Sequence, residues 1–97
     1  MPRITLSRRA QSDLSRLYEF LAAYDTQNAQ RAVATILDAF EQLTMPTVGV
    51  PVADRPGLRK LVIDFGSSGY VALYRYSPKT DTLRILAMKH QKEDDYK

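Results

Sequence analysis

The 97-residue sequence predicts an α+β fold, in which a helical hairpin packs on one face of a small, mainly antiparallel sheet. Apolar residues recur at helical spacing through the first half of the chain, whereas three β-prone runs separated by turn residues fill the second half. A sheet with one apolar face needs cover, and the two helices are the only segments that could provide it. We therefore expect one domain over residues 1–97, in the order β-α-α-β-β-β.

Composition limits the chemistry that the chain can perform. It has no cysteine, which excludes disulfides, a thiolate nucleophile and a cysteine-based zinc site. The net charge of +3 fits either a solvated surface with a small excess of base or an anionic partner. No signal-like apolar core opens the sequence, and no apolar run approaches the roughly 18 residues of a membrane span. We expect a cytoplasmic protein.

The first half predicts a short strand at residues 3–6 and then two helices. Ser7 can cap a helix that ends near Tyr24, and a second helix follows from about Gln27 to Leu43. The predicted inner residues of the first helix are Ala10, Leu14, Leu17, Tyr18 and Leu21. Those of the second helix are Ala29, Ala32, Val33, Ile36, Leu37, Phe40 and Leu43. The short connection between them makes the helices an antiparallel hairpin.

A proline-rich loop over residues 44–56 leads to a three-stranded meander. Gly66 to Gly69 and Ser77 to Thr82 form its turns. The first of these turns looks only superficially like a phosphate loop, because no helix follows it. Lys79 and Asp81 are turn residues with a structural role. The tail, residues 91–97, is either a frayed end or a short helix folded back onto the sheet.

Strand alternation predicts which side chains face the helices. In the middle run, Tyr70, Ala72, Tyr74 and Tyr76 share one face, and Val71, Leu73 and Arg75 share the other. In the last run, the small apolar Ile85 and Ala87 suggest that their face, with Leu83 and Lys89, meets the helices. Arg84, Leu86, Met88 and His90 then look outward. The outer face is rather apolar, which suggests that a partner covers part of it.

Few residues are candidates for chemistry. His90, the sole histidine, could serve as a general acid–base or could simply cap the end of a strand. Arg59 and Arg75 lie on neighbouring strands and could converge on an anion, or each could pair with a nearby acid. The tyrosines fit core or rim positions better than base-stacking platforms. We expect no cofactor and no metal.

Three segments of the second half carry a family resemblance: Leu58-Arg59-Lys60-Leu61, Gly69-Tyr70-Val71-Ala72-Leu73-Tyr74-Arg75 and Ile85-Leu86-Ala87-Met88-Lys89-His90. Together with the order of the elements and the length of the chain, they resemble the RelE/ParE superfamily of bacterial toxins. These are the toxin halves of type II toxin–antitoxin pairs. The resemblance implies one of two activities. RelE-like members cleave messenger RNA on the ribosome, whereas ParE-like members are reported to poison DNA gyrase and are not nucleases.

The resemblance also allows family positions to be compared. Anchored on Ser67-Ser68-Gly69-Tyr70, the positions of the two lysines and the arginine of RelE hold Val62, Asp64 and Val71 here. The late arginine of the family aligns roughly with His90, and its terminal tyrosine with Tyr96. Electrostatic stabilisation is usually the largest catalytic contribution, so loss of the basic cluster argues against efficient RNA cleavage. Arg59 and Arg75 match what many ParE-like members carry, which favours the ParE-like branch.

Two alternatives remain open. A sparser, metal-independent ribonuclease could use Arg75 to steady phosphate, His90 to shuttle the proton and Tyr96 to position substrate. A protein that has lost toxicity could serve mainly to bind its antitoxin. In every case the resemblance implies a ParD- or RelB-like antitoxin, a toxin–antitoxin hetero-oligomer, and either DNA gyrase or the ribosome with mRNA as target. The residues expected to bind a target or partner are Arg59, Lys60, Leu73, Arg75, Arg84, Leu86, Met88 and His90.

Overall fold

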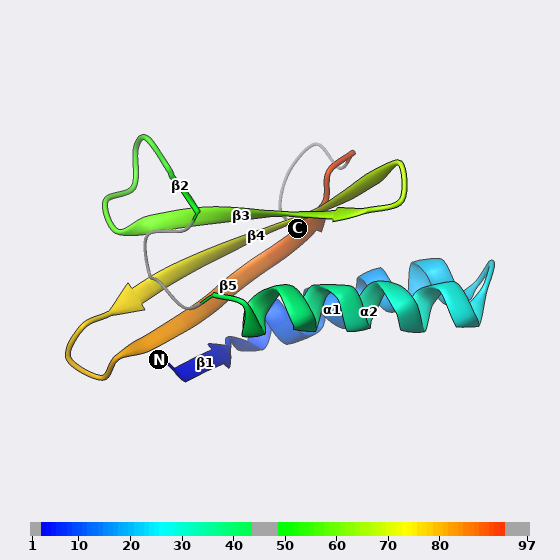
Figure 1. Cartoon of the computed structure of the whole chain (residues 1–97), viewed down its shortest axis with the longest axis horizontal. Coiled ribbons are helices and arrows are strands. Elements are labelled where there is room, and N and C mark those ends of the chain that lie inside the picture. Colours follow the sequence, from blue (N-terminus) through cyan, green and yellow to red (C-terminus); the bar gives the residue numbers. More distant parts are fainter. Residues whose placement is uncertain (1–2, 44–48, 93–97) are drawn as a thin grey trace.

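A computed structural model of the chain describes residues 3–43 and 49–92. Two helices lie together on one side of a twisted sheet (Figure 1). This arrangement confirms the α+β fold and the β-α-α-β-β-β order, to which the structure adds one short strand. The elements are β1 (Arg3–Leu6), α1 (Arg8–Ala22), α2 (Thr26–Glu41), β2 (Val50–Pro51), β3 (Leu58–Phe65), β4 (Ser68–Ser77) and β5 (Thr82–His90).

The helix boundaries follow from capping side chains. The Ser7 hydroxyl accepts a hydrogen bond from the Ala10 N–H at 3.0 Å, which confirms the predicted cap of α1. Asp25 caps α2 in the same way, since its Oδ1 accepts from the Asn28 N–H at 3.2 Å. Neither helix is both long enough and apolar enough to cross a bilayer, within the ranges that the structure describes.

The sheet has the strand order β1-β5-β4-β3-β2. β1 runs parallel to β5, and every other neighbouring pair is antiparallel, as expected of a mainly antiparallel sheet. The turn between β3 and β4 contains Gly66 with a φ of 63°, a backbone conformation that glycine adopts without steric cost. The predicted loop is only partly a loop, because Val50 and Pro51 pair with Lys60 and Arg59 at the edge of the sheet. Its residues 44–48 lie outside the described ranges.

The core lies between the helix pair and one face of the sheet. Its fully buried members include Ile36, Tyr74, Leu83 and Ile85, each at most 1% exposed. Most of the predicted inner residues of the helices are buried or half-buried there. Leu37 is an exception, because it is 41% exposed on α2. The prediction was wrong there, since position 37 lies 100° around the helix from the buried Ile36.

A β-bulge in β5 reverses part of the predicted face assignment. Leu73 pairs with Ala87 and Tyr74 pairs with Ile85, so Leu86 has no opposite residue on β4. Alternation therefore restarts after Leu86. The prediction that Met88 and His90 face outward while Ala87 and Lys89 face the helices was wrong. Met88 is fully buried in the core beside Ala72, and His90 lies against Tyr70.

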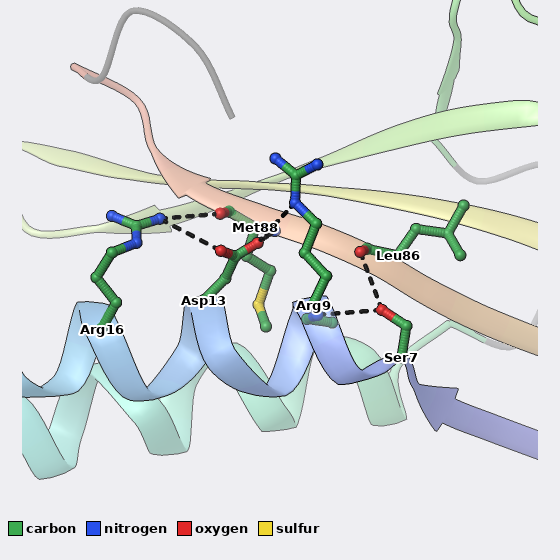
Figure 2. Close-up of polar contacts among 7 residues, drawn as sticks. Ser7, Arg9, Asp13, Arg16, Leu86 and Met88 are labelled. Carbon is green, nitrogen blue, oxygen red and sulfur yellow. Dashed lines mark hydrogen bonds and ion pairs between the residues drawn. The ribbon is translucent and has the colours of Figure 1, made fainter. Parts of the chain in front are cut away.

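Beyond the end of β1, the N-cap and polar side chains of α1 form hydrogen bonds with the edge of β5. The Ser7 N–H donates to the Ile85 carbonyl at 2.9 Å, and its hydroxyl donates to the Leu86 carbonyl at 3.0 Å. One helical turn and a half further on, Asp13 Oδ2 accepts from the Met88 N–H at 2.9 Å (Figure 2). Arg16 Nη2 donates to the Met88 carbonyl at 3.3 Å. These contacts satisfy backbone groups that a neighbouring strand would otherwise bind.

Candidate functional site

The face of the sheet turned away from the helices, here called the outer face, carries most of the predicted binding residues. Pairing between strands sets transverse rows of side chains on it, and three adjacent rows carry its cations and most of its apolar side chains. The rows are Val62–Val71–Lys89, Lys60–Leu73–Ala87 and Leu58–Arg75–Arg84. Figure 2 shows the side chain of Leu86, at the bulge, directed away from α1 toward the same side. The outer face is therefore apolar at Val71 and Leu73 on the central strand, with Lys60 and Lys89 on the strands to either side, and one end row brings Arg75 and Arg84 together.

Arg75 and Arg84 are direct neighbours on this face. They are paired across β4 and β5, and both are exposed. Directly opposed side chains have Cβ atoms about 5 Å apart, and like charges at such positions destabilise a sheet. An anionic group bound between the two guanidinium groups would relieve that repulsion. This pair is therefore a candidate site for a carboxylate or phosphate group.

A groove next to the arginine pair provides apolar surface. It has a volume of about 570 Å³ and runs between the outer face and the segment from Val50 to Arg55. Its apolar lining on the sheet comes from Leu58, Val71 and Leu73, and the side chains of Lys60 and Lys89 also line it. The charged side chains lining the groove, Arg55 included, are all cations. Its chemistry suits a partner segment that combines apolar and acidic side chains.

Arg59 does not join Arg75. Although the two are close in the sheet, Arg59 pairs with Tyr74, whose side chain faces the helices, and Arg75 pairs with Leu58 on the outer face. Arg59 Nη1 instead donates to the Gly49 carbonyl at 2.8 Å, and the Tyr74 hydroxyl accepts from the Gly49 N–H at 2.7 Å. Of the two alternatives for this pair, convergence on an anion does not fit the structure, because Arg59 follows Leu58, the residue opposite Arg75, and neighbouring positions along a strand point to opposite faces. Arg59 anchors the segment that walls the groove.

His90 lies on the other face, beside α1. Its ring meets the Tyr70 ring edge-on, with centroids 5.4 Å apart, and its Nδ1 accepts from the Lys92 N–H at 3.1 Å. Since His90 pairs with Tyr70, five positions along β4 from Arg75, the two residues are about 17 Å apart along the sheet. The structure thus does not bring Arg75 and His90 together. Tyr96 lies outside the described residues.

Asp13 is a residue that the sequence reasoning missed. It is only 4% exposed, and its carboxylate lies 3.8 Å from Arg9 Nε and 3.7 Å from Arg16 Nη2. In the sequence, arginines three residues after and four residues before an acid could have signalled ion pairs on a helix. Nothing in the sequence placed that acid against the backbone of a strand 75 residues away.

Comparison with known proteins identifies the fold as that of a toxin. A family model described as the ParE toxin of the type II toxin–antitoxin system, parDE, matches residues 4–95. The chain belongs to this family. Toxin RelE3 of Caulobacter vibrioides is 32% identical over 93 residues, which cover 96% of this chain and 98% of that protein. The chain is therefore a member of the RelE/ParE superfamily, as the resemblance implied.

Solved structures agree with this fold. A chain of the chromosomal ParDE system from P. aeruginosa superposes with a TM-score of 0.76 at 22% identity, covering 93% of this chain and 96% of that one. A chain of the RelBE2 toxin–antitoxin complex from Mycobacterium tuberculosis gives a TM-score of 0.64 at 25% identity, covering 95% and 93%. ParE and RelE proteins share this architecture, so the fold alone does not choose between their activities.

Proposed function

We propose that this ParE-family chain is a ParE-like inhibitor of DNA gyrase that acts by binding and is neutralised by a cognate antitoxin in the cytoplasm. The observation that carries the proposal is the outer face, which combines an apolar groove with the paired cations Arg75 and Arg84. Surfaces that combine apolar side chains with charged ones at their rim are typical of protein–protein contacts. Gyrase would be held by shape and charge, with no chemistry performed on it.

The distribution of proton-transferring groups supports binding over cleavage. By resemblance, the positions at which RelE carries basic residues are Val62, Asp64 and Val71, and all three lie on the outer face. His90, the group suited to proton transfer, is on the opposite face. Among the described residues, the outer face therefore combines cations with no histidine to move a proton from a ribose hydroxyl. Asp64 would also repel a phosphate brought to that end of the sheet.

An antitoxin partner is supported by the relatives. The structures with the same fold come from systems named as ParDE and RelBE2 toxin–antitoxin pairs. We propose that the antitoxin of this chain covers the outer face, with carboxylates near Arg75 and Arg84 and apolar residues in the groove. Leu73, Leu86 and Lys60 would lie at this contact, whereas Met88, being buried, would not. The resulting assembly is a toxin–antitoxin hetero-oligomer.

A supercoiling assay tests the proposal. Wild-type protein should inhibit supercoiling of relaxed plasmid by gyrase and should leave end-labelled mRNA on translating ribosomes uncut. The double variant Arg75→Glu/Arg84→Glu should lose inhibition by about tenfold or more, because charge reversal opposes complementary contact. Arg31→Glu, an exposed arginine on α2, is the matched control and should inhibit like wild type. Absence of gyrase inhibition by the wild-type protein would refute the proposal.

The alternative is a RelE-like, ribosome-dependent mRNA endoribonuclease, and the relative named Toxin RelE3 is the reason to test it. This function predicts cuts at defined codon positions that depend on Arg75, His90 or Tyr96. Cleavage abolished by His90→Ala would establish it. If the wild-type protein neither inhibits gyrase nor cuts RNA, and its expression leaves growth unchanged, the chain serves mainly to bind its antitoxin.

A further inference from the structure

One side of the outer-face groove is formed by a segment that has little strand pairing of its own. The segment from Val50 to Arg55, here called the wall, lines the groove opposite the sheet. Only Val50 and Pro51 of the wall pair with β3, and proline has no N–H to donate to a ladder. Strands usually have at least three residues, so this pairing alone gives the wall little support. Other contacts must therefore hold the wall against the sheet.

Two side chains of the sheet bind the residue that precedes the wall. The Tyr74 hydroxyl accepts a hydrogen bond from the Gly49 N–H at 2.7 Å, and Arg59 Nη1 donates to the Gly49 carbonyl at 2.8 Å. Tyr74 and Arg59 lie directly opposite each other on β4 and β3, so both reach Gly49 from the helix-facing side of the sheet. One cross-strand pair, here called the Gly49 clamp, thus binds both backbone polar groups of a single residue.

Gly49 fits the clamp because it has no side chain. A Cβ atom at this position would lie 2.5 Å from the Lys60 carbonyl oxygen and 2.8 Å from the Tyr74 hydroxyl. Both distances are shorter than an ordinary contact of a Cβ atom, and the first is to a backbone atom that cannot swing aside. Lys60 is also the residue that pairs with Val50. An alanine at position 49 would therefore displace the start of the wall.

Tyr74 connects the clamp to the core. The residue is 0% exposed and belongs to the core cluster, so close packing fixes the position of its hydroxyl. After β2, the Val52 N–H donates to the Leu58 carbonyl at 2.9 Å, and the Leu58 N–H donates to the Arg55 carbonyl at 3.1 Å. These backbone bonds close the loop at the end of the wall, whereas the clamp fixes its beginning at Gly49.

We infer that Tyr74 and Arg59 are positioning residues for the outer-face groove, because they hold the wall through Gly49 at a fixed distance from the sheet. Neither is among the described residues that line the groove. The inference rests on the proposed function in taking the groove as part of the gyrase-binding surface. Detachment of the wall would remove its apolar side chains and Arg55 from the groove. Affinity on the outer face therefore depends on a tyrosine that is buried on the opposite face.

The test makes two measurements on each variant. Hydrogen exchange at the Val52 amide, followed by NMR, reports whether the wall stays on the sheet, and the half-inhibitory concentration in the gyrase supercoiling assay reports binding. Tyr74→Phe removes only the hydroxyl, and it should accelerate Val52 exchange about tenfold and weaken inhibition about fivefold. Tyr76→Phe is the matched control, since it removes another hydroxyl of β4, one that binds Asp81 in the β4–β5 turn. Both measurements on this control should match wild type.

Two further variants test the clamp from its other members. Gly49→Ala leaves both clamp side chains in place but forces the backbone away, so it should accelerate Val52 exchange and weaken inhibition at least as much as Tyr74→Phe. Arg59→Met keeps a long apolar stem without the donor to the Gly49 carbonyl, and it should change both measurements in the same direction. The amides of β5 should stay protected from exchange in every variant, which shows that the fold is intact.

The outcomes separate the inference from the proposed function. If Val52 exchanges in Tyr74→Phe and Gly49→Ala as it does in wild type, the clamp does not hold the wall and the inference is wrong. If exchange accelerates while inhibition is unchanged, the wall is no part of the gyrase-binding surface, which overturns the inference and leaves the proposed function standing. If the wild-type protein does not inhibit gyrase, the proposed function fails, and the positioning role for gyrase binding fails with it.

Discussion

Replacement of Asp13 by alanine tests whether α1 holds the bulged end of β5 as described. The Met88 N–H would lose its acceptor in a buried setting, which costs about 1–3 kcal/mol. The contacts to Arg9 and Arg16 join partly exposed guanidinium groups, so each adds only about 0.2–1 kcal/mol. Part of this loss is offset because the carboxylate no longer has to be desolvated. We expect a net loss of about 2–3 kcal/mol.

Urea denaturation followed by circular dichroism gives the measurement. With an m-value of about 1–1.5 kcal/mol/M for a chain of this size, the midpoint should fall by about 1.3–3 M. Asp13→Asn keeps an oxygen that can accept from the Met88 N–H, and it should lose about 1 kcal/mol. Asp38→Ala, which removes an exposed aspartate on α2, is the control and should change stability by less than about 0.5 kcal/mol. Equal losses in Asp13→Asn and Asp13→Ala would refute the role assigned to the backbone contact.

Two further predictions concern the sheet. Burial raises the pKa of Tyr70, so its contribution to stability is complete below about pH 10 and is lost as pH rises through the folded-state pKa. Tyr70→Phe should therefore flatten the fall of thermal stability above pH 10, and an unchanged alkaline profile would contradict this. Deletion of Leu86 should preserve a cooperative fold, because Ile85 and Ala87 already pair with neighbouring β4 residues and Met88 stays inward. Loss of cooperative unfolding in this variant would show that the bulge is essential.

The elements of the fold were predictable because local chemistry decides them. Ser7 and the spacing of Ala10, Leu14 and Leu17 predict α1, and the Gly66 turn predicts the β3–β4 hairpin; both are confirmed. The very short β2 was missed because Pro51 contributes no ladder donor, and its strand forms only by pairing with Arg59 and Lys60. Both helices begin and end within two residues of the predicted positions.

The candidate site was predicted less well, because it depends on which face each residue takes. Arg75 and Arg84 were both expected on the outer face and are there, but as a pair that the sequence analysis did not connect. Arg59 and His90 were placed on the wrong face for different reasons. Arg59 was grouped with Arg75 only because the two strands are neighbours, whereas the face of His90 was assigned by continuing strand alternation through the β-bulge. The predicted contributions of these residues to target or antitoxin binding stay predictions.

The sequence by itself determined the helices, the meander and the RelE/ParE resemblance, since these depend on periodicity, capping and turn residues along short stretches of chain. Only the tertiary structure decided the faces of residues 87–90. The reason is physical: β1 ends at Leu6, and Ser7, the N-cap of α1, and Asp13 on α1 bind the exposed edge of β5 where the extra residue lies. A one-residue shift of that kind sends every later side chain of the strand to the opposite side of the sheet.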